Sequence, residues 1–145
     1  MTGPTLYAFR AKFRLAELEV ARPAGWVLSV RPGQLTLGAM VLTVESGVQE
    51  LAAMDAAAGA GLAEGLSLAE RLAREVYGAV RINALCLMMQ DPVVHFHILP
   101  RYDRPVERHG RIWQDTDWPG PPSIRPVNDE AAVLWAVRDE LRQVL

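Results

Sequence analysis

The strongest fold signal in this sequence is the segment from Val93 to Leu99, which is rich in β-branched and aromatic residues. A segment of this kind, preceded by an Asp-Pro pair, is typical of a β-strand. Side chains two residues apart in a strand point to the same face of the sheet. We therefore expect Val93, His95 and His97 to share one face, while the apolar residues between them point into the core.

Two pairs of extended segments predict a sheet built from hairpins. Residues 25–30 and 34–44 are rich in strand-forming residues and flank a Pro-Gly pair, which favours a tight turn. Residues 80–89 and 93–99 flank the Asp-Pro pair in the same way. Each pair of segments is expected to form one antiparallel hairpin.

Helical patterns separate and follow the two hairpins. Residues 48–58 are expected to hold a first short helix. Ser67 and Glu70 have the spacing of a capping box and predict the start of a longer helix, with Gly78 as its stop. The last helix is predicted over residues 128–145, where Asn128 is the cap and apolar residues recur at helical spacing.

This order of elements favours an α+β domain with an antiparallel β-sheet and helices packed on one face of it. The length of 145 residues predicts a single domain, residues 1–145, because two separate cores would each be small. Residues 104–126, with four prolines near their end, are expected to run irregularly over the surface. Residues 6–15 fit neither a helical nor a strand pattern clearly.

Composition excludes several classes of protein. The formal net charge of −2 gives no basic surface for nucleic acid, so no nucleic-acid partner is expected. The lone cysteine, Cys86, excludes an internal disulfide and is itself expected in the core. The longest apolar run, residues 84–89, is too short to span a membrane, and the first residues lack the features of a signal peptide. We therefore expect a cytoplasmic protein with no membrane partner.

His95 and His97 would lie about 7 Å apart along one strand face. Imidazole is the side chain best suited to nucleophilic or proton-transfer work near neutral pH, and two on one face can divide that work. The pair alone is also compatible with a sheet face that has no role, or with a metal site. A metal site needs a third ligand, and the candidates Asp91 and His109 stand at no familiar spacing.

The whole segment Val93-Val-His-Phe-His-Ile-Leu-Pro-Arg101 resembles the motif of the histidine triad superfamily, in which three histidines alternate with apolar residues. In this sequence Val93 stands where the motif has its first histidine. The resemblance covers residues 13–121 and extends to other segments. These are residues 25–30 and 36–42, which are similar to the family's early hairpin, Arg81-Ile-Asn83, and Asp115-Thr-Asp-Trp-Pro-Gly120.

The resemblance implies a five-stranded antiparallel sheet, a homodimer and a nucleotide as the small-molecule partner. It further implies a nucleotide phosphohydrolase or nucleotidylyl transferase that forms a covalent nucleotidyl-histidine at the α-phosphate. Among bacterial members it is closest to the diadenosine polyphosphate hydrolase type. The implied substrates are dinucleoside polyphosphates, such as diadenosine tetraphosphate, or nucleoside phosphoramidates. No cofactor is required, although magnesium can accompany a polyphosphate.

By resemblance, His95 is the catalytic nucleophile. One of its ring nitrogens attacks phosphorus, and the other donates to a main-chain carbonyl on a neighbouring strand. His97 binds phosphate oxygens and stabilises charge or assists the leaving group. Gln90 and Asn83 are the further substrate-binding candidates, both at the phosphate. Gln90 can equally be a residue before a turn, and Asn83 can make local hydrogen bonds.

Other residues have a functional and a structural interpretation. Trp26 and Leu37 either line the nucleoside cleft or belong to the core. Arg101 either neutralises phosphate or, as we expect, pairs with a carboxylate such as Asp103. His109 is expected to be a solvated loop residue. Trp113 and Trp118 are expected to cover a sheet edge or a core margin, with packing across a dimer interface as the alternative that the resemblance implies for Trp118. Trp135 is expected to pack as part of the last helix.

The missing first histidine leaves more than one function open. Loss of a supporting group typically lowers turnover by one or two orders of magnitude, about 10- to 100-fold, and leaves the nucleophile in place. We therefore expect a weak or selective hydrolase. The alternative is a nucleotide-binding protein with little or no catalysis because Val93 cannot hydrogen-bond. A third hypothesis is a metal-binding sheet protein that uses His95 and His97.

Overall fold

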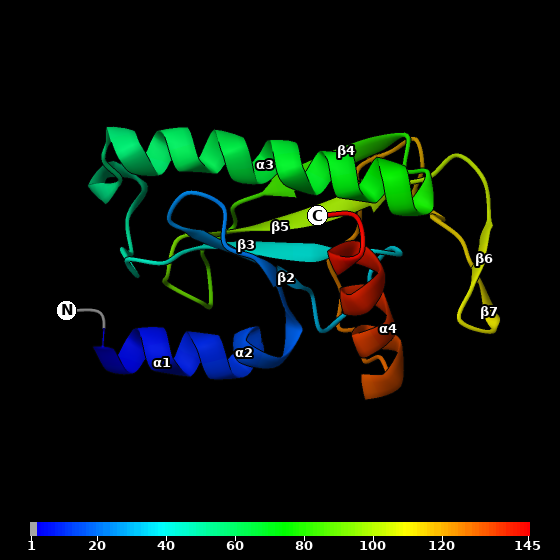
Figure 1. Cartoon of the computed structure of the whole chain (residues 1–145), viewed down its shortest axis with the longest axis horizontal. Helices are drawn as coiled ribbons and strands as arrows, with labels where there is room; N and C mark the ends of the chain where they lie inside the picture. Colours follow the sequence, from blue (N-terminus) through cyan, green and yellow to red (C-terminus); the bar gives the residue numbers. More distant parts are fainter. Residues whose placement is uncertain (1–2) are drawn as a thin grey trace.

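The computed structural model describes residues 3–145, which fold into three layers (Figure 1). Helix α3 (Ala56–Tyr77) covers one face of the sheet. Helices α1 (Gly3–Lys12) and α2 (Leu15–Leu18) lie below the opposite face. Helix α4 (Ala131–Arg142) packs beside the first strands and against α3. Helices thus cover both faces, and the prediction of one covered face was wrong because the unassigned N-terminal residues form helices of their own.

The sheet has five antiparallel strands in the order β1-β2-β3-β5-β4, which confirms the predicted α+β class and antiparallel architecture. The strands are β1 (Glu19–Ala21), β2 (Trp26–Val30), β3 (Met40–Val44), β4 (Arg81–Leu85) and β5 (His95–Arg101). Strand β1 was not predicted.

The first predicted hairpin is present as β2 and β3, but residues 34–39 form a loop instead of a strand. The Gln34 side chain causes this. Its amide nitrogen donates to the carbonyl oxygens of Arg31 and Ala39, and its amide oxygen accepts from the Gly38 N–H. These bonds occupy backbone groups that a longer ladder would need.

The second hairpin is present as β4 and β5, and both strands are shorter at the turn than predicted. Strand β4 ends at Leu85 and β5 begins at His95, so residues 86–94 form a loop. Met88 in this loop has a φ of 53°, in the left-handed region, which interrupts an extended chain. Val93 therefore precedes the strand, where it is buried in the core.

The long helix begins earlier than predicted. Asp55 is its N-cap and accepts a hydrogen bond from the Ala58 N–H at 2.8 Å, so the capping-box spacing at Ser67 falls inside the helix. Of the short helix expected over residues 48–58, only a 3-10 turn at Leu51–Ala53 forms. The helix stops at Gly78, as predicted, with a φ of 72°.

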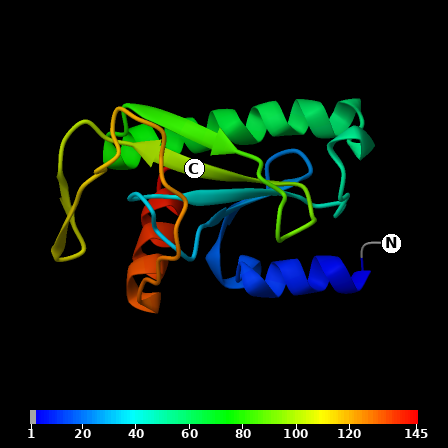
Figure 2. The same cartoon turned by 180° about the vertical axis from the view of Figure 1, so that it is seen from behind.

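The C-terminal part departs from prediction in two places. Helix α4 starts at Ala131, and its N-cap is Glu130 rather than Asn128. The expected irregular stretch contains a small antiparallel hairpin of β6 (Val106–Arg108) and β7 (Arg111–Trp113). Figure 2 shows this hairpin at the end of the molecule opposite the N-terminus. No helix in residues 3–145 has both the length and the apolar character that crossing a bilayer requires.

Candidate functional site

Strand β5 places the two imidazoles side by side. His95 pairs with Thr43 and His97 with Val41 across the β3–β5 ladder, so the two histidines share one sheet face, as predicted. Their ring centroids are 5.0 Å apart, and the rings are nearly perpendicular, at 81°. Helices α1 and α2 lie below this face of the sheet. Strand β5 therefore holds the two imidazoles next to each other on the side that faces these helices.

The His95 ring is oriented by its own chain. Its Nδ1 lies 2.6 Å from the carbonyl oxygen of Val93. A carbonyl oxygen only accepts, so Nδ1 carries the proton and Nε2 carries the lone pair. Burial lowers the pKa of His95, which favours this neutral form. The predicted acceptor on a neighbouring strand was wrong, because the chain bends at Val93 and brings that residue's carbonyl under the ring.

The His97 ring is held in the opposite tautomer. Arg31 Nε donates to His97 Nδ1 at 3.1 Å, which leaves the proton on Nε2. Burial, the Arg31 charge and His95 lower the pKa of His97 to about 4, so this ring is neutral at neutral pH. Sequence reasoning missed Arg31. Its place at the end of a predicted strand was visible, but its reach to His97 depends on the strand order.

Helix α1 closes the site. The Phe9 ring centroid lies 4.8 Å from that of His95, and Phe13 lies 5.6 Å from His95 and 6.1 Å from His97. His95 is 2% and His97 7% exposed. A hollow of about 440 Å³ between α1, α2 and the sheet is lined by Val27 but by neither imidazole. The Phe9 and Phe13 side chains of α1 therefore cover the two imidazoles on this face of the sheet.

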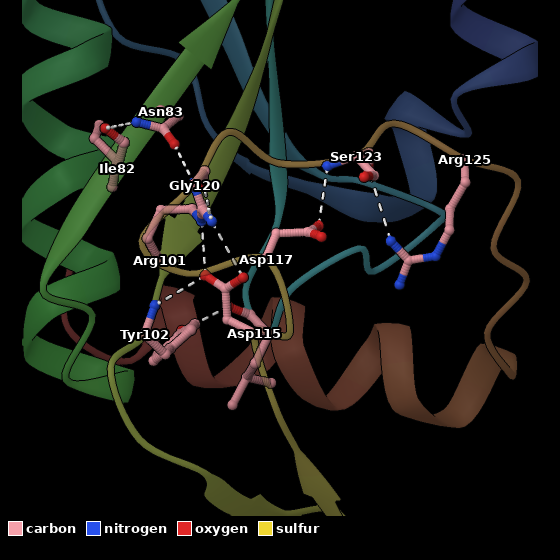
Figure 3. Close-up of polar contacts among 10 residues, drawn as sticks. Ile82, Asn83, Arg101, Tyr102, Asp115, Asp117, Gly120, Ser123 and Arg125 are labelled. Carbon is pink, nitrogen blue, oxygen red and sulfur yellow. Dashed lines mark hydrogen bonds and ion pairs between the residues drawn. The ribbon is translucent and has the colours of Figure 1, made fainter.

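Asn83 lies in a separate polar cluster (Figure 3). Its side chain accepts from Arg101 at 2.7 Å and donates to the carbonyl of Ile82 at 3.2 Å. Arg101 also forms a buried ion pair with Asp115 at 2.6 Å and donates to the carbonyl of Gly120 at 2.9 Å. The structure thus brings Asn83 to Arg101 rather than to the imidazoles, in line with the local-bonding alternative.

Arg101 pairs with a carboxylate, as predicted, but the partner is Asp115 rather than Asp103. Asp103 pairs instead with Arg104 at 3.2 Å, on the surface. Asp115 takes its place at Arg101 because its carboxylate also accepts from the Tyr102 N–H, which fixes it beside the end of β5. The buried charge of Arg101 is neutralised by this pair.

Gln90 is exposed in the loop over residues 86–94, and its role at a phosphate stays a prediction. Trp26 is core: it points to the α3 side, its indole donates to the Ala58 carbonyl, and its ring lies 6.0 Å from Phe96. Leu37 is also buried in the core.

His109 and the three remaining tryptophans contact other parts of the protein. His109 is mostly buried and lies 2.8 Å from Glu140, so the prediction of a solvated loop residue was wrong. The Trp118 ring lies under Arg101, at 5.6 Å. Trp113 is buried at a core margin, as predicted, whereas Trp135 is substantially exposed and donates to a carboxylate.

Neither Cys86 nor the histidine pair has the surroundings that the sequence suggested for a core thiol or a metal site. Cys86 is half-buried in the loop after β4 rather than in the core, and burial raises the pKa of its thiol. In the part of the chain that the structure describes, no group of three or more His, Cys, Asp or Glu side chains could hold a metal ion. His95 and His97 therefore have no third ligand among these residues.

Comparison with solved structures identifies the fold. A histidine triad protein from Sinorhizobium meliloti matches with a TM-score of 0.70 and 15% identity, over 91% of this chain and 93% of that one. One from Marinobacter aquaeolei matches with a TM-score of 0.69 and 20% identity, over 91% and 92% of the two chains.

A hypothetical histidine triad nucleotide-binding protein from Sulfolobus tokodaii matches with a TM-score of 0.69 and 14% identity, over 87% and 81% of the two chains. No protein-family model matches the chain, and no curated protein matches it in sequence. At these identities the comparisons show that the chain has the histidine triad fold.

Proposed function

We propose that this protein is a nucleotide-binding member of the histidine triad superfamily that transfers or hydrolyses nucleotides through His95. The observation that carries the proposal is the 2.6 Å contact between His95 Nδ1 and the Val93 carbonyl. It leaves Nε2 with a lone pair for attack, which a nucleophilic imidazole requires. The fold supports the proposal because one protein that shares it is described as nucleotide-binding.

In the first step, Nε2 of His95 attacks the α-phosphorus of a bound nucleotide. An N–P bond forms while the bond from phosphorus to the leaving group breaks. A dinucleoside polyphosphate releases a nucleoside polyphosphate anion, and a phosphoramidate releases an amine that takes a proton from solvent. The ring becomes cationic because Nδ1 keeps its proton. The Val93 carbonyl accepts from this N–H and stabilises the developing positive charge.

In the second step, water attacks the phosphorus, the N–P bond breaks, and its electron pair returns to Nε2. The nucleoside monophosphate leaves, and the proton of water passes to a phosphate oxygen or to solvent. His97 Nε2–H donates to a phosphate oxygen in both steps. Dinucleoside polyphosphates and nucleoside phosphoramidates are the proposed substrates, the former with magnesium.

The replacement of the first triad histidine favours a second candidate function, nucleotide binding with little or no turnover. Val93 is fully buried and apolar, so its side chain offers nothing to a phosphate. Its main-chain carbonyl is retained whatever the side chain is, and the orientation of His95 is retained with it. We therefore rank a weak enzyme above a pure binding protein.

Trapping the covalent intermediate tests the proposal. Wild-type protein is mixed with diadenosine tetraphosphate or an adenosine phosphoramidate, quenched and examined by mass spectrometry for an adenylyl group on His95. His95→Ala should abolish both adduct and turnover with the fold intact by circular dichroism. Binding of AMP without adduct or turnover in wild-type protein would select the second candidate. A homodimer and a cytoplasmic location stay predictions.

A further inference from the structure

Arg31 carries a charge that no group in residues 3–145 neutralises. Its guanidinium is largely buried, and burial lowers its pKa. Its hydrogen-bond partners are the neutral ring of His97 at 3.1 Å and the carbonyl oxygen of Gly33 at 2.7 Å. None of the described carboxylates forms an ion pair with it. Buried charges in proteins are normally paired, so this arrangement points to an anion from outside the chain.

The geometry around Arg31 is built to hold it. Arg31 stands at the end of β2 and crosses β3 to reach His97 on β5. Gly33 allows this course, because a Cβ at that position would lie 2.8 Å from a terminal nitrogen of Arg31 and 2.7 Å from the Val127 carbonyl oxygen. A guanidinium has five N–H donors, and these two bonds use two of them. Three donors are therefore available to a ligand.

A second, independent feature lies on the same face. Thr43 is directly opposite His95 in the β3–β5 ladder and is 1% exposed. Its hydroxyl has no hydrogen-bond partner in the described structure. A buried hydroxyl without a partner is costly, and a ligand oxygen that accepts from it would remove this cost. Thr43 lies beside the ring whose Nε2 carries the lone pair.

We propose that Arg31, Thr43 and His97 Nε2–H form an oxyanion site beside His95 that binds the phosphate group of a nucleoside phosphate. Arg31 acts twice: it binds a phosphate oxygen, and it fixes His97 as an Nε2–H donor. The identity of the ligand as a nucleoside phosphate rests on the proposed function. The site itself rests on the unneutralised guanidinium of Arg31 and the unpartnered hydroxyl of Thr43. In it, the Arg31 cation donates hydrogen bonds to the phosphate, which the Val93 side chain cannot do.

Binding of AMP compared with adenosine tests this site, because the two ligands differ by the phosphate alone. Isothermal titration is performed on wild-type protein, Arg31→Gln, Arg31→Lys and the control Arg125→Gln, which removes an exposed charge. Charge-assisted hydrogen bonds of this kind change affinity about 10- to 100-fold. Arg31→Gln should lower the affinity for AMP by that factor and leave the affinity for adenosine unchanged. Arg31→Lys should recover part of the lost AMP affinity. Arg125→Gln should bind both ligands as tightly as the wild-type protein does.

Two further measurements separate binding from structure. The melting temperature of Arg31→Gln should not fall below that of wild type, because the guanidinium has no carboxylate partner to lose. Imidazole ¹⁵N NMR should show His97 protonated on Nε2 in wild-type protein, with that preference lost in Arg31→Leu.

Retained AMP affinity in Arg31→Gln, equal losses for AMP and adenosine, or no binding of AMP to wild-type protein would overturn the inference. Trapping of adenylyl-His95 is judged separately. Loss of AMP affinity in Arg31→Gln without any adduct in wild-type protein would support the oxyanion site while rejecting catalysis.

Discussion

The ammonium of Lys12 lies 2.8 Å from each carboxylate oxygen of Asp91. This contact ties α1 to the loop that precedes the histidine strand. Lys12 is 53% exposed, and ion pairs at such positions contribute about 0–1 kcal/mol. The tie is therefore weak, and α1 is held mainly by the buried Phe9 and Phe13 rings, which cover both imidazoles.

Removal of this ion pair should loosen α1 over the imidazoles. In Lys12→Ala, the rate at which diethylpyrocarbonate modifies the two imidazoles should rise about 2- to 5-fold, the equivalent of up to 1 kcal/mol. The melting temperature should change little. Arg74→Ala removes a comparable surface pair with Glu70, far from the imidazoles, and should leave the rate unchanged. Equal rates in wild type and Lys12→Ala would mean that Lys12 does not hold the cover.

The free energy of unfolding should fall as the pH drops below 6.5. His95 and His97 have lowered pKa values in the folded state, to about 4 for His97, against 6.5 for the ordinary histidine. Below pH 6.5 the unfolded chain binds protons that the folded chain does not. This contribution to stability is therefore complete above pH 6.5 and is lost as pH falls through the folded pKa of each histidine, by about 1.4 kcal/mol per pH unit for His97 down to about pH 4.

Urea unfolding at pH 7.5, 6.0 and 5.0 measures this dependence. His97→Gln should reduce the slope between pH 6.5 and 5, because one of the two groups with a lowered pKa is gone. Asp115 and Glu140 also have lowered pKa values, but their ordinary values of 3.8 and 4.5 place their effect at lower pH. A slope unchanged by His97→Gln would show that His97 does not titrate as the structure implies.

The sequence was sufficient for the histidine face because strand alternation is local. His95 and His97 differ by two positions, and any strand through them puts both on one face. The hairpins around them were also predictable, since each is formed by neighbouring segments. The loop at Gln34 was not, because a side chain closing on three backbone groups leaves no periodic signal.

Contacts across the sheet were beyond sequence reasoning. Arg31 and His97 are 66 positions apart in the sequence. They meet because β2 and β5 are both neighbours of β3, so the Arg31 side chain has only one strand to cross. The cover over the site was missed for a related reason. Phe9 and Phe13 stand four apart, as on one side of a helix, but two residues alone do not define a pattern, and nothing local says which face of the sheet α1 will meet.

The buried pair of Arg101 and Asp115 should be a main stabiliser of the C-terminal segment. Each side chain is 3% exposed, and removal of one partner of such a pair costs about 3–5 kcal/mol. Asp115→Ala should therefore lower the free energy of unfolding by that amount. Asp103→Ala removes an exposed partner of Arg104 and should cost less than about 1 kcal/mol. Similar losses in both variants, measured by urea unfolding, would contradict this assignment.

Thr43 provides the sharpest separation of stability from binding. Its buried hydroxyl has no partner, and such a group costs about 1–3 kcal/mol. Thr43→Val keeps the branched shape of the side chain and removes the unpartnered hydroxyl. It should therefore raise the free energy of unfolding by about 1 kcal/mol and lower the affinity for AMP. Thr36 also has a buried hydroxyl without a partner, but it lies in the loop before β3. Thr36→Val should therefore stabilise the fold to a similar extent and leave AMP affinity unchanged. Thermal melts and AMP titrations measure both quantities, and a Thr43→Val protein that is less stable than wild type, or that binds AMP equally well, would remove Thr43 from the oxyanion site.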